Sequence, residues 1–190
     1  MRKVFLFNMT TLDGFFEGPN QDISWHHVDD EFNEFAIEQL NEIGTLLFGR
    51  VTYQGMASYW PTEFAIKDDP IVAGLMNSLP KIVFSKTLDK AEWNNSRLVK
   101  ENAAEEVSRL KQQAGKDIAI FGSSDLAVTL ADAAQSSGLI DEYRVIVNPV
   151  FLGQGTSLLK GIKAKLNLKL LKTRVFKSGN VLLIYAPEKE

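Results

Sequence analysis

Apolar and polar positions follow two different periods along the chain, and these predict strands and helices in turn. Residues 3–10 are mainly β-branched and aromatic, and the turn-forming pair Asp13-Gly14 comes shortly after them, as after a strand. In residues 29–43 the apolar side chains recur at helical spacing behind an acidic start, which favours an amphipathic helix. The chain is therefore predicted to begin with a strand–helix unit.

The same order of strand and helix continues through the middle of the chain. The segment from Asn102 to Glu105 has a capping-box pattern and predicts the start of a helix, whereas Pro61 and Pro70 bracket a predicted loop. Other short apolar runs and amphipathic segments predict strands at residues 45–48, 81–85 and 117–121, and helices at residues 52–59 and 124–134.

The C-terminal part of the chain has strand patterns only. These cover residues 142–151, 166–176 and 181–186, and residues 177–180 have the composition of a hairpin turn. Strand–helix units need right-handed crossovers and hence a mainly parallel sheet. We predict a single α/β domain over residues 1–190, with a mostly parallel central sheet and an antiparallel hairpin at its C-terminal end.

Composition and charge exclude several classes of protein. The 190 residues, 45% hydrophobic and 24% charged, are typical of a globular domain. A net charge of −3 without a basic cluster gives no reason to expect a nucleic-acid partner, and the absence of cysteine excludes disulfides and thiolate metal sites. The N-terminal apolar run, Val4 to Phe7, is too short for a membrane span, so cytoplasmic location is expected. No metal site is expected either, because adjacent histidines such as His26 and His27 point apart.

Two strand–helix junctions carry candidate chemistry. At the first, Gly49 lets the chain approach a ligand, Arg50 offers a fork of donors, and Thr52 can cap the helix or donate its hydroxyl. The second, Gly122 with Ser123 and Ser124, offers backbone N–H groups and a helix dipole to an anion. Each junction alone is more typical of turn geometry than of a phosphate site, but the two together favour phosphate binding.

Two further features have simpler interpretations. Lys86 follows the strand at residues 81–85 and is either a solvated lysine or a third cation near a phosphate. The Gly153-Gln-Gly155 segment lacks the third glycine of a dinucleotide fingerprint and no helix pattern follows it, so it is predicted to be a loop.

These residues carry a resemblance. The segment from Gly49 to Gln54 resembles the G-R-x-T-[WY]-[EQ] motif of dihydrofolate reductases, and the segment from Thr11 to Gly14 resembles the S-L-D-G turn of the riboflavin-biosynthesis reductase domain, which shares that fold. Residues 83–88 are similar to the strand end that this superfamily places against the adenosine phosphate, and Gly122 to Ser124 lie where it has a glycine pair. The resemblance extends over nearly the whole chain and is closest to stand-alone relatives of the C-terminal reductase domain of the bifunctional riboflavin-biosynthesis deaminase-reductase.

The resemblance implies a dihydrofolate reductase-like three-layer sandwich and an NADPH-dependent reductase acting on a pteridine-like or ribosylamino-pyrimidine-like small molecule. It further implies a homodimer formed through the sheet. The apolar runs at residues 145–147 and 181–184 are compatible with this contact and equally with core strands. The implied cofactor contacts are Gly49, Arg50, Thr52, Ser85, Lys86, Gly122, Ser123 and Ser124.

The resemblance also implies positions for the substrate and for a proton donor. Asp30 follows Trp25 at the offset at which dihydrofolate reductases place a carboxylate, and Asp13 competes with it because riboflavin-type relatives keep an aspartate at the mouth of the site. The simpler roles are helix capping for Asp30 and turn formation for Asp13. Trp25 and Phe16 are the candidate substrate contacts.

The chain departs from these families at several points. Ser123 replaces the second glycine of the pair, there is no proline-rich segment after Trp25, and the zinc deaminase partner is absent. Two alternatives therefore stay open. One is a nucleotide-binding module without turnover. The other is a non-catalytic protein that binds a small molecule in an aromatic cage of Phe15, Phe16, Trp25, Phe32 and Trp60.

Overall fold

A central sheet of eight strands organises the protein. The computed structural model describes residues 1–133, 138–163 and 165–188. The strands of the central sheet are β1 (Val4–Thr11), β3 (Ile43–Gly49), β4 (Lys81–Phe84), β5 (Ser96–Val99), β6 (Asp117–Phe121), β7 (Glu142–Asn148), β9 (Leu168–Val175) and β10 (Val181–Pro187). Their order is β5-β4-β3-β6-β1-β7-β10-β9. All pairs from β5 to β7 are parallel, and β10 runs antiparallel to both β7 and β9. The predicted mostly parallel sheet with its C-terminal hairpin is confirmed.

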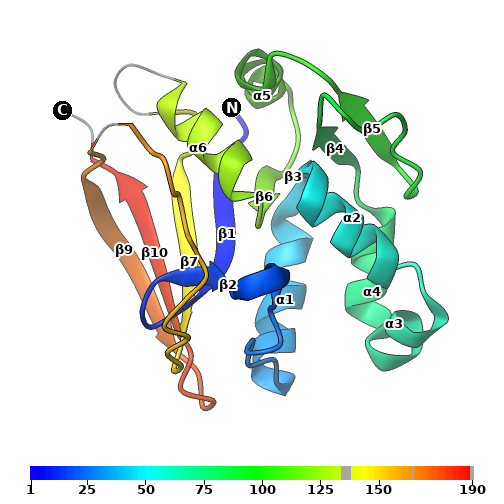
Figure 1. Ribbon diagram of the computed structural model, residues 1–190. Coiled ribbons are helices and arrows are strands. Elements are labelled where there is room, and N and C mark those ends of the chain that lie inside the picture. The colour runs from blue at the N-terminus through cyan, green and yellow to red at the C-terminus, as the bar shows by residue number, and fades with distance from the viewer. Residues whose placement is uncertain (134–137, 164, 189–190) are drawn as a thin grey trace.

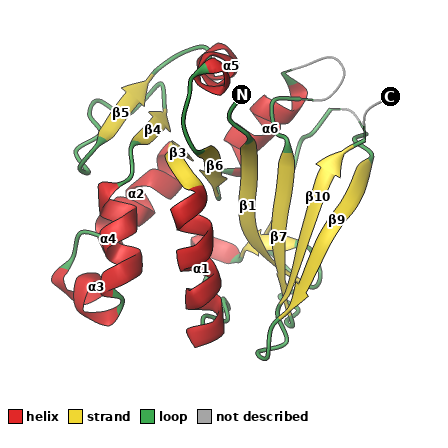
Figure 2. Ribbon diagram, turned by 180° about the vertical axis from the view of Figure 1, so that it is seen from behind, coloured by secondary structure: helices red, strands yellow, loops and turns green. Residues whose placement is uncertain are grey.

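Helices cover both faces of this sheet and so form the outer two of three layers (Figures 1 and 2). The helices are α1 (Asp30–Glu42), α2 (Arg50–Tyr59), α3 (Glu63–Asp68), α4 (Pro70–Ser78), α5 (Ala103–Gln112) and α6 (Ser124–Asp132). On one face α1, α2 and α4 pack over Phe5 and Phe48, and on the other α5 and α6 pack over Leu6 and Ile120. Because helices cover both faces, neighbours in β1 such as Phe5 and Leu6 are both fully buried, which explains its continuous apolar run.

A second, two-stranded sheet lies beside the carboxyl ends of the central strands. It pairs β2 (Phe15–Glu17) with β8 (Thr156–Ser157) in antiparallel orientation. A single 3-10 turn, η1 (Pro19–Gln21), follows β2. The hydrophobic pattern does not predict this sheet, because strands of two or three residues have no measurable period.

Several predicted elements differ from the structure. The predicted loop between Pro61 and Pro70 is wrong, because it contains α3, and the unpredicted α4 begins directly at Pro70. The side chains of Thr62 and Asp69 cap these two helices, and Pro70 stands in the first turn of α4, where proline is favoured. The sequence therefore contained signals for the starts of both helices. The edge strand β5 was also not predicted. The helix predicted over residues 124–134 extends to Asp132, and Ala134 lies outside the described residues.

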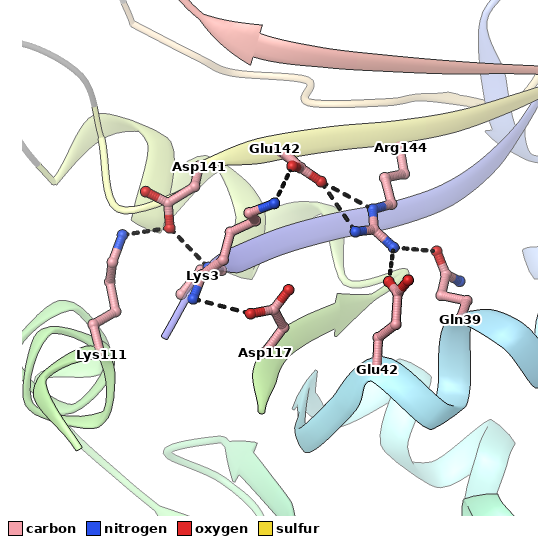
Figure 3. A network of polar contacts seen from close by, with 9 residues as sticks. Lys3, Gln39, Glu42, Lys111, Asp117, Asp141, Glu142 and Arg144 are labelled. Atoms are coloured by element: carbon pink, nitrogen blue, oxygen red, sulfur yellow. Dashed lines mark hydrogen bonds and ion pairs between the residues drawn. The ribbon is translucent and has the colours of Figure 1, made fainter. Parts of the chain in front are cut away.

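The amino ends of the strands are held by charged side chains (Figure 3). Buried Arg144 on β7 donates to Glu142 at 3.0 Å and to Glu42 of α1 at 3.2 Å, and its guanidinium stacks on Phe5. Lys3 pairs with Glu142 on its other side. This end of the sheet is therefore filled by the protein's own ion pairs, in contrast to the opposite end. Within the described residues, no helix is long and apolar enough to span a bilayer.

Candidate functional site

One cleft of about 970 Å³ lies at the carboxyl ends of β3, β4 and β6, where α2 and α6 begin. Open α/β sheets bind ligands at this edge, next to the point where the chain connections change direction. The β2–β8 sheet and the start of α5 contribute further walls. The predicted cofactor contacts that line the cleft are Gly49, Arg50, Thr52, Ser85, Lys86, Ser123 and Ser124.

The β3–α2 junction presents Arg50 to the cleft. Gly49 is the N-cap residue of α2, so the helix begins at Arg50 itself, two residues earlier than predicted. The exposed Arg50 guanidinium donates to Gln54 Oε1 at 2.9 Å, one helical turn along α2. This contact directs the arginine along the helix and leaves most of its five donors for a ligand.

The β6–α6 junction is built from two consecutive residues in the left-handed conformation. Gly122 has a φ of +58° and Ser123 a φ of +57°. A Cβ on Gly122 would lie 3.0 Å from Thr52 Cγ2, so glycine is required here both for the backbone and for the close approach of α2. Gly122 thus forms the packing contact behind the cleft, and Ser123 and Ser124 form its surface.

Reciprocal hydrogen bonds join the two junctions. Ser123 Oγ accepts a bond from Gly49 N at 2.8 Å, and Thr52 Oγ1 accepts one from Ser123 N at 3.1 Å. The backbone N–H groups of Gly49 and Ser123 are therefore already used inside the protein, as is that of Gly122, which donates to Phe7 O at 3.2 Å. Thr52 does not cap α2, and its hydroxyl instead fixes the start of α6.

The β4 end contributes Ser85 and Lys86. Ser85 Oγ accepts bonds from Thr87 N at 3.2 Å and from Leu88 N at 3.0 Å, which shapes the loop after the strand. Lys86 is exposed at the same turn and lines the cleft. Of this pair, Lys86 is the residue available to a ligand.

The helix N-termini fall into two groups. The helices α1, α3 and α4 have side-chain caps, from Asp29, Thr62 and Asp69. The helices α2, α5 and α6, whose first residues line the cleft, have no side-chain cap. The capping box predicted at Asn102 is wrong, because Asn102 adopts a left-handed conformation and its side chain makes no capping bond. Three uncapped helix N-termini, each with a partial positive charge, thus converge on one cleft.

The β2 strand brings one predicted residue and one missed residue to the cleft. Phe16, a predicted substrate contact, lines it together with Glu17, which the sequence analysis did not identify. Cations and carboxylates alternate farther along the cleft, where Lys100, Glu101 and Asp125 also face it. The motifs gave no signal for Glu17, Lys100 and Glu101, because the β2–β8 sheet and β5 place them there, whereas Asp125 lies in the first turn of α6 directly after the predicted Ser124.

The two predicted carboxylates lie outside the set of described residues that line the cleft. Asp30 is exposed in the first turn of α1, where Asp29 is the capping residue. Asp13 accepts three hydrogen bonds: from Thr11 Oγ1 at 2.6 Å, Leu152 N at 3.3 Å and Gly153 N at 2.8 Å. These bonds, that from Thr11 above all, hold the pKa of Asp13 below its ordinary value.

The aromatic residues considered for a cage do not meet at one place. Trp25 and Phe32 pack against Phe35 and Met9 between α1 and the sheet, and Trp25 Nε1 donates to Asp22 O at 3.1 Å. Trp60 packs in the separate core around α2 and α4, whereas Phe16 alone of the set lines the cleft. Trp25, the second predicted substrate contact, supports the loop before α1 without lining the cleft.

Comparison with known proteins gives matches along almost the whole chain. The family model of the RibD C-terminal domain matches residues 2–182. The uncharacterized protein YyaP of Bacillus subtilis (strain 168) is 36% identical over 186 residues, which are 97% of this chain and 94% of YyaP.

Solved structures share the fold at lower identity. The diaminohydroxyphosphoribosylaminopyrimidine deaminase/5-amino-6-(5-phosphoribosylamino)uracil reductase of Thermotoga maritima has a TM-score of 0.68 at 15% identity, over 98% of this chain and 57% of that one. Dihydrofolate reductase from Enterococcus faecalis, solved with NADP(H), has a TM-score of 0.65 at 16% identity, over 98% of this chain and 97% of that one. These likenesses confirm the dihydrofolate reductase-like fold.

Proposed function

The chain belongs to the RibD C-terminal domain family, and from this membership we propose that it is an NADPH-dependent reductase of a pteridine-like or ribosylamino-pyrimidine-like small molecule. The observation that carries the proposal is the convergence of three uncapped helix N-termini with Arg50 and Lys86 on one cleft. Backbone N–H groups and cations together form the usual binding site of phosphate groups in α/β proteins. A dinucleotide offers several phosphates along an extended molecule, which suits a long cleft.

The residues fit this cofactor at distinct points. Arg50 and Lys86 would pair with phosphate oxygens, and the N–H groups at the starts of α2, α5 and α6 would donate to others. Ser123 and Ser124 would form the surface under the pyrophosphate. NADPH when bound supplies the hydride. Phe16 would then orient the substrate ring and help to exclude water at the β2 wall.

The proton needed by the reduced double bond has to come from a nearby acid. We propose Asp30 or Glu17, because both carboxylate oxygens of Asp13 already accept hydrogen bonds. Glu17 lines the cleft beside Phe16, whereas Asp30 lies outside the cleft lining and is proposed from its sequence position alone, which is that of the dihydrofolate reductase carboxylate. With a substrate that the enzyme reduces, Glu17→Gln and Asp30→Asn are each compared with wild type for kcat and its pH profile. The donor variant loses the alkaline limb, which is the fall in kcat as the donor deprotonates at high pH, and full activity in both variants would contradict this assignment.

The alternative is a nucleotide-binding module on the same fold that lacks turnover. It shares every phosphate contact with the reductase, so cofactor titration does not separate the two. Oxidation of NADPH with a panel of pteridines and ribosylaminopyrimidines does, because only the reductase consumes the cofactor.

The proposal is tested first by titrating the purified protein with NADPH and with NADH, followed by fluorescence or calorimetry. We expect Arg50→Ala and Lys86→Ala each to weaken NADPH binding about tenfold or more, since one charge-assisted hydrogen bond contributes roughly 1.5–3 kcal/mol. Lys67→Ala is the matched control, because Lys67 is exposed on α3 away from the cleft. Failure of the wild type to bind either nucleotide would refute the cofactor assignment.

A further inference from the structure

Asp13 joins two loops that are far apart in the sequence. It lies in the connection between β1 and β2, and its partners Leu152 and Gly153 lie in the connection between β7 and β8. These connections lead into the two strands of the β2–β8 sheet. Asp13 therefore stands where the two strands enter the small sheet.

The contacts of Asp13 form a small closed network. Its Oδ2 accepts a bond from Gly153 N at 2.8 Å, and its Oδ1 accepts bonds from Leu152 N and from the hydroxyl of Thr11. The same Thr11 hydroxyl accepts a bond from Phe15 N at 3.0 Å, at the first residue of β2. One buried threonine and one carboxylate thus tie β2 and the β7–β8 loop to the end of β1.

Backbone bonds also hold the small sheet: Leu12 N donates to Val150 O at 2.9 Å between the same two loops, and Leu158 N donates to Gly14 O at 3.4 Å. Two strands of three and two residues form only a marginal pairing by themselves. Gly155 packs so closely that a Cβ there would lie 2.3 Å from Glu17 O, and its φ of +154° is one that glycine alone adopts readily. The glycines of the Gly153-Gln-Gly155 segment therefore serve this contact: Gly153 donates to Asp13 and Gly155 lets β8 lie against β2.

We propose that Asp13 is a positioning residue that fastens the β2–β8 sheet in place as a wall of the cleft. The sheet carries Phe16, Glu17 and Thr156, which all line the cleft. With the carboxylate in place, these three side chains are preorganised for the ligand, and without it the wall opens and has to be ordered on binding. The effect on ligand affinity rests on the proposed function, whereas the fastening of the sheet does not.

The fastening is tested by amide hydrogen exchange of the ligand-free protein. In Asp13→Ala we expect at least about tenfold faster exchange in residues 151–158, a segment that does not contain the substitution, because local opening is no longer opposed by two charge-assisted bonds. Thr11→Val should raise exchange in residues 14–17 in the same way, since valine keeps the shape and removes the hydroxyl. Asp22→Ala is the matched control, because among the described residues the Asp22 carboxylate accepts a hydrogen bond only within its own loop, from Ser24 N. Unchanged exchange in residues 151–158 of Asp13→Ala would overturn the proposal.

A second measurement separates positioning from proton donation. Titration with NADPH should show about tenfold weaker binding in Asp13→Ala, with a smaller loss in Asp13→Asn, which keeps one acceptor oxygen. A proton donor would behave differently: Asp13→Asn would abolish turnover while exchange and NADPH affinity stayed at the wild-type level, and that pattern would also overturn the proposal. If the wild type binds no NADPH, the proposed function fails, and the exchange result still decides whether Asp13 fastens the sheet.

Discussion

The side chain of Lys81 is buried in the fold, although its position in the sequence suggests exposure. As the first residue of β4 it looks like an exposed strand end, yet its side chain is 1% exposed. Its amino group donates to the carbonyl oxygens of Leu79 at 2.7 Å, Asn94 at 3.1 Å and Asn77 at 3.2 Å, and lies over the Trp93 ring. Burial without a carboxylate partner lowers the pKa of Lys81 to about 8. The lysine therefore joins the end of α4 to the segment before β5.

This lysine leads to a prediction about stability and pH. The lysine pKa rises from about 8 in the folded state to its ordinary 10.5 on unfolding. Between these values the unfolded state binds more protons, so the free energy of unfolding should increase with pH, by up to about 3 kcal/mol. Urea unfolding at several pH values should show this rise in wild type and in Lys90→Met, an exposed control, but not in Lys81→Met. An equal rise in Lys81→Met would assign the effect to other groups.

Removal of the same amino group has a cost at neutral pH as well. Lys81→Met leaves the carbonyl oxygens of three part-buried bonds without their donor, and we expect a loss of about 2–4 kcal/mol in the free energy of unfolding at pH 7. A change below 0.5 kcal/mol would mean that water replaces the amino group.

At the scale of elements, the strand–helix junctions decide the candidate site. Both phosphate-type junctions were found from the sequence, because strand, glycine and helix start follow one another along the chain. Their mutual bonds were not predictable, since Ser123 and Thr52 are far apart in the sequence and meet only because β3 and β6 are neighbours. The third junction, at the start of α5, was misread as capped: Asn102 is left-handed, and its side chain donates to the Glu105 carboxylate at 3.3 Å without accepting a bond from a backbone N–H of the first turn.

The bond between Thr52 and Ser123 gives a prediction at this scale. Thr52→Val removes the acceptor of Ser123 N, which lies in a buried residue, and we expect a destabilisation of about 1–3 kcal/mol. Thermal or urea unfolding measures it. Thr129→Val serves as control, because Thr129 is exposed on α6 and bonds only to the helix backbone, so its change should stay within about 0.5 kcal/mol. Equal changes in the free energy of unfolding for the two variants would show that the bond between the junctions contributes no more to stability than a bond within one helix.

At the scale of the whole molecule, the sheet ends in an exposed apolar strand. The apolar runs of β7 and β10 pair with each other inside the chain, with Val147 opposite Val181. The outer neighbour β9 exposes Leu170, Leu171 and Val175 by about half or more. Monomers rarely leave such a surface uncovered, and an exposed edge is a place for association.

We therefore keep the homodimer as a prediction and place its contact at β9. Sedimentation equilibrium should give the mass of a dimer for the wild type and that of a monomer for the double variant Leu170→Lys, Val175→Lys. Dimer formation would bury the two charged lysine side chains against apolar surface, and this desolvation costs free energy. Ile71→Lys, an exposed apolar position on α4, is the control that should leave the dimer intact. A monomeric wild type would exclude the prediction.

Much of this protein was determined by the sequence itself. The hydrophobic pattern predicted β1, α1, β3, β6 and α6, because these elements bury enough apolar surface to need a regular pattern. The turn residues between β9 and β10 predicted the C-terminal hairpin. The short strands β2, β5 and β8 were not predicted, because they have too few residues for a period and are stabilised by their neighbours. The capping residues of α3 and α4, Thr62 and Asp69, were visible in the sequence. These helices were nevertheless not predicted, because Pro61 and Pro70 were interpreted as the limits of a loop.

The candidate site divides in the same way. Local motifs identified Gly49, Arg50, Lys86 and the Gly122–Ser124 turn, because a strand end and a helix start are set by neighbouring residues. Tertiary structure alone decided that α5 points at the same cleft, that Glu17 lines it, and that Asp13 bonds to the loop before β8. The physical reason is that hydrogen bonds and cleft walls form between residues that are distant along the chain, and their meeting depends on the order and register of the strands.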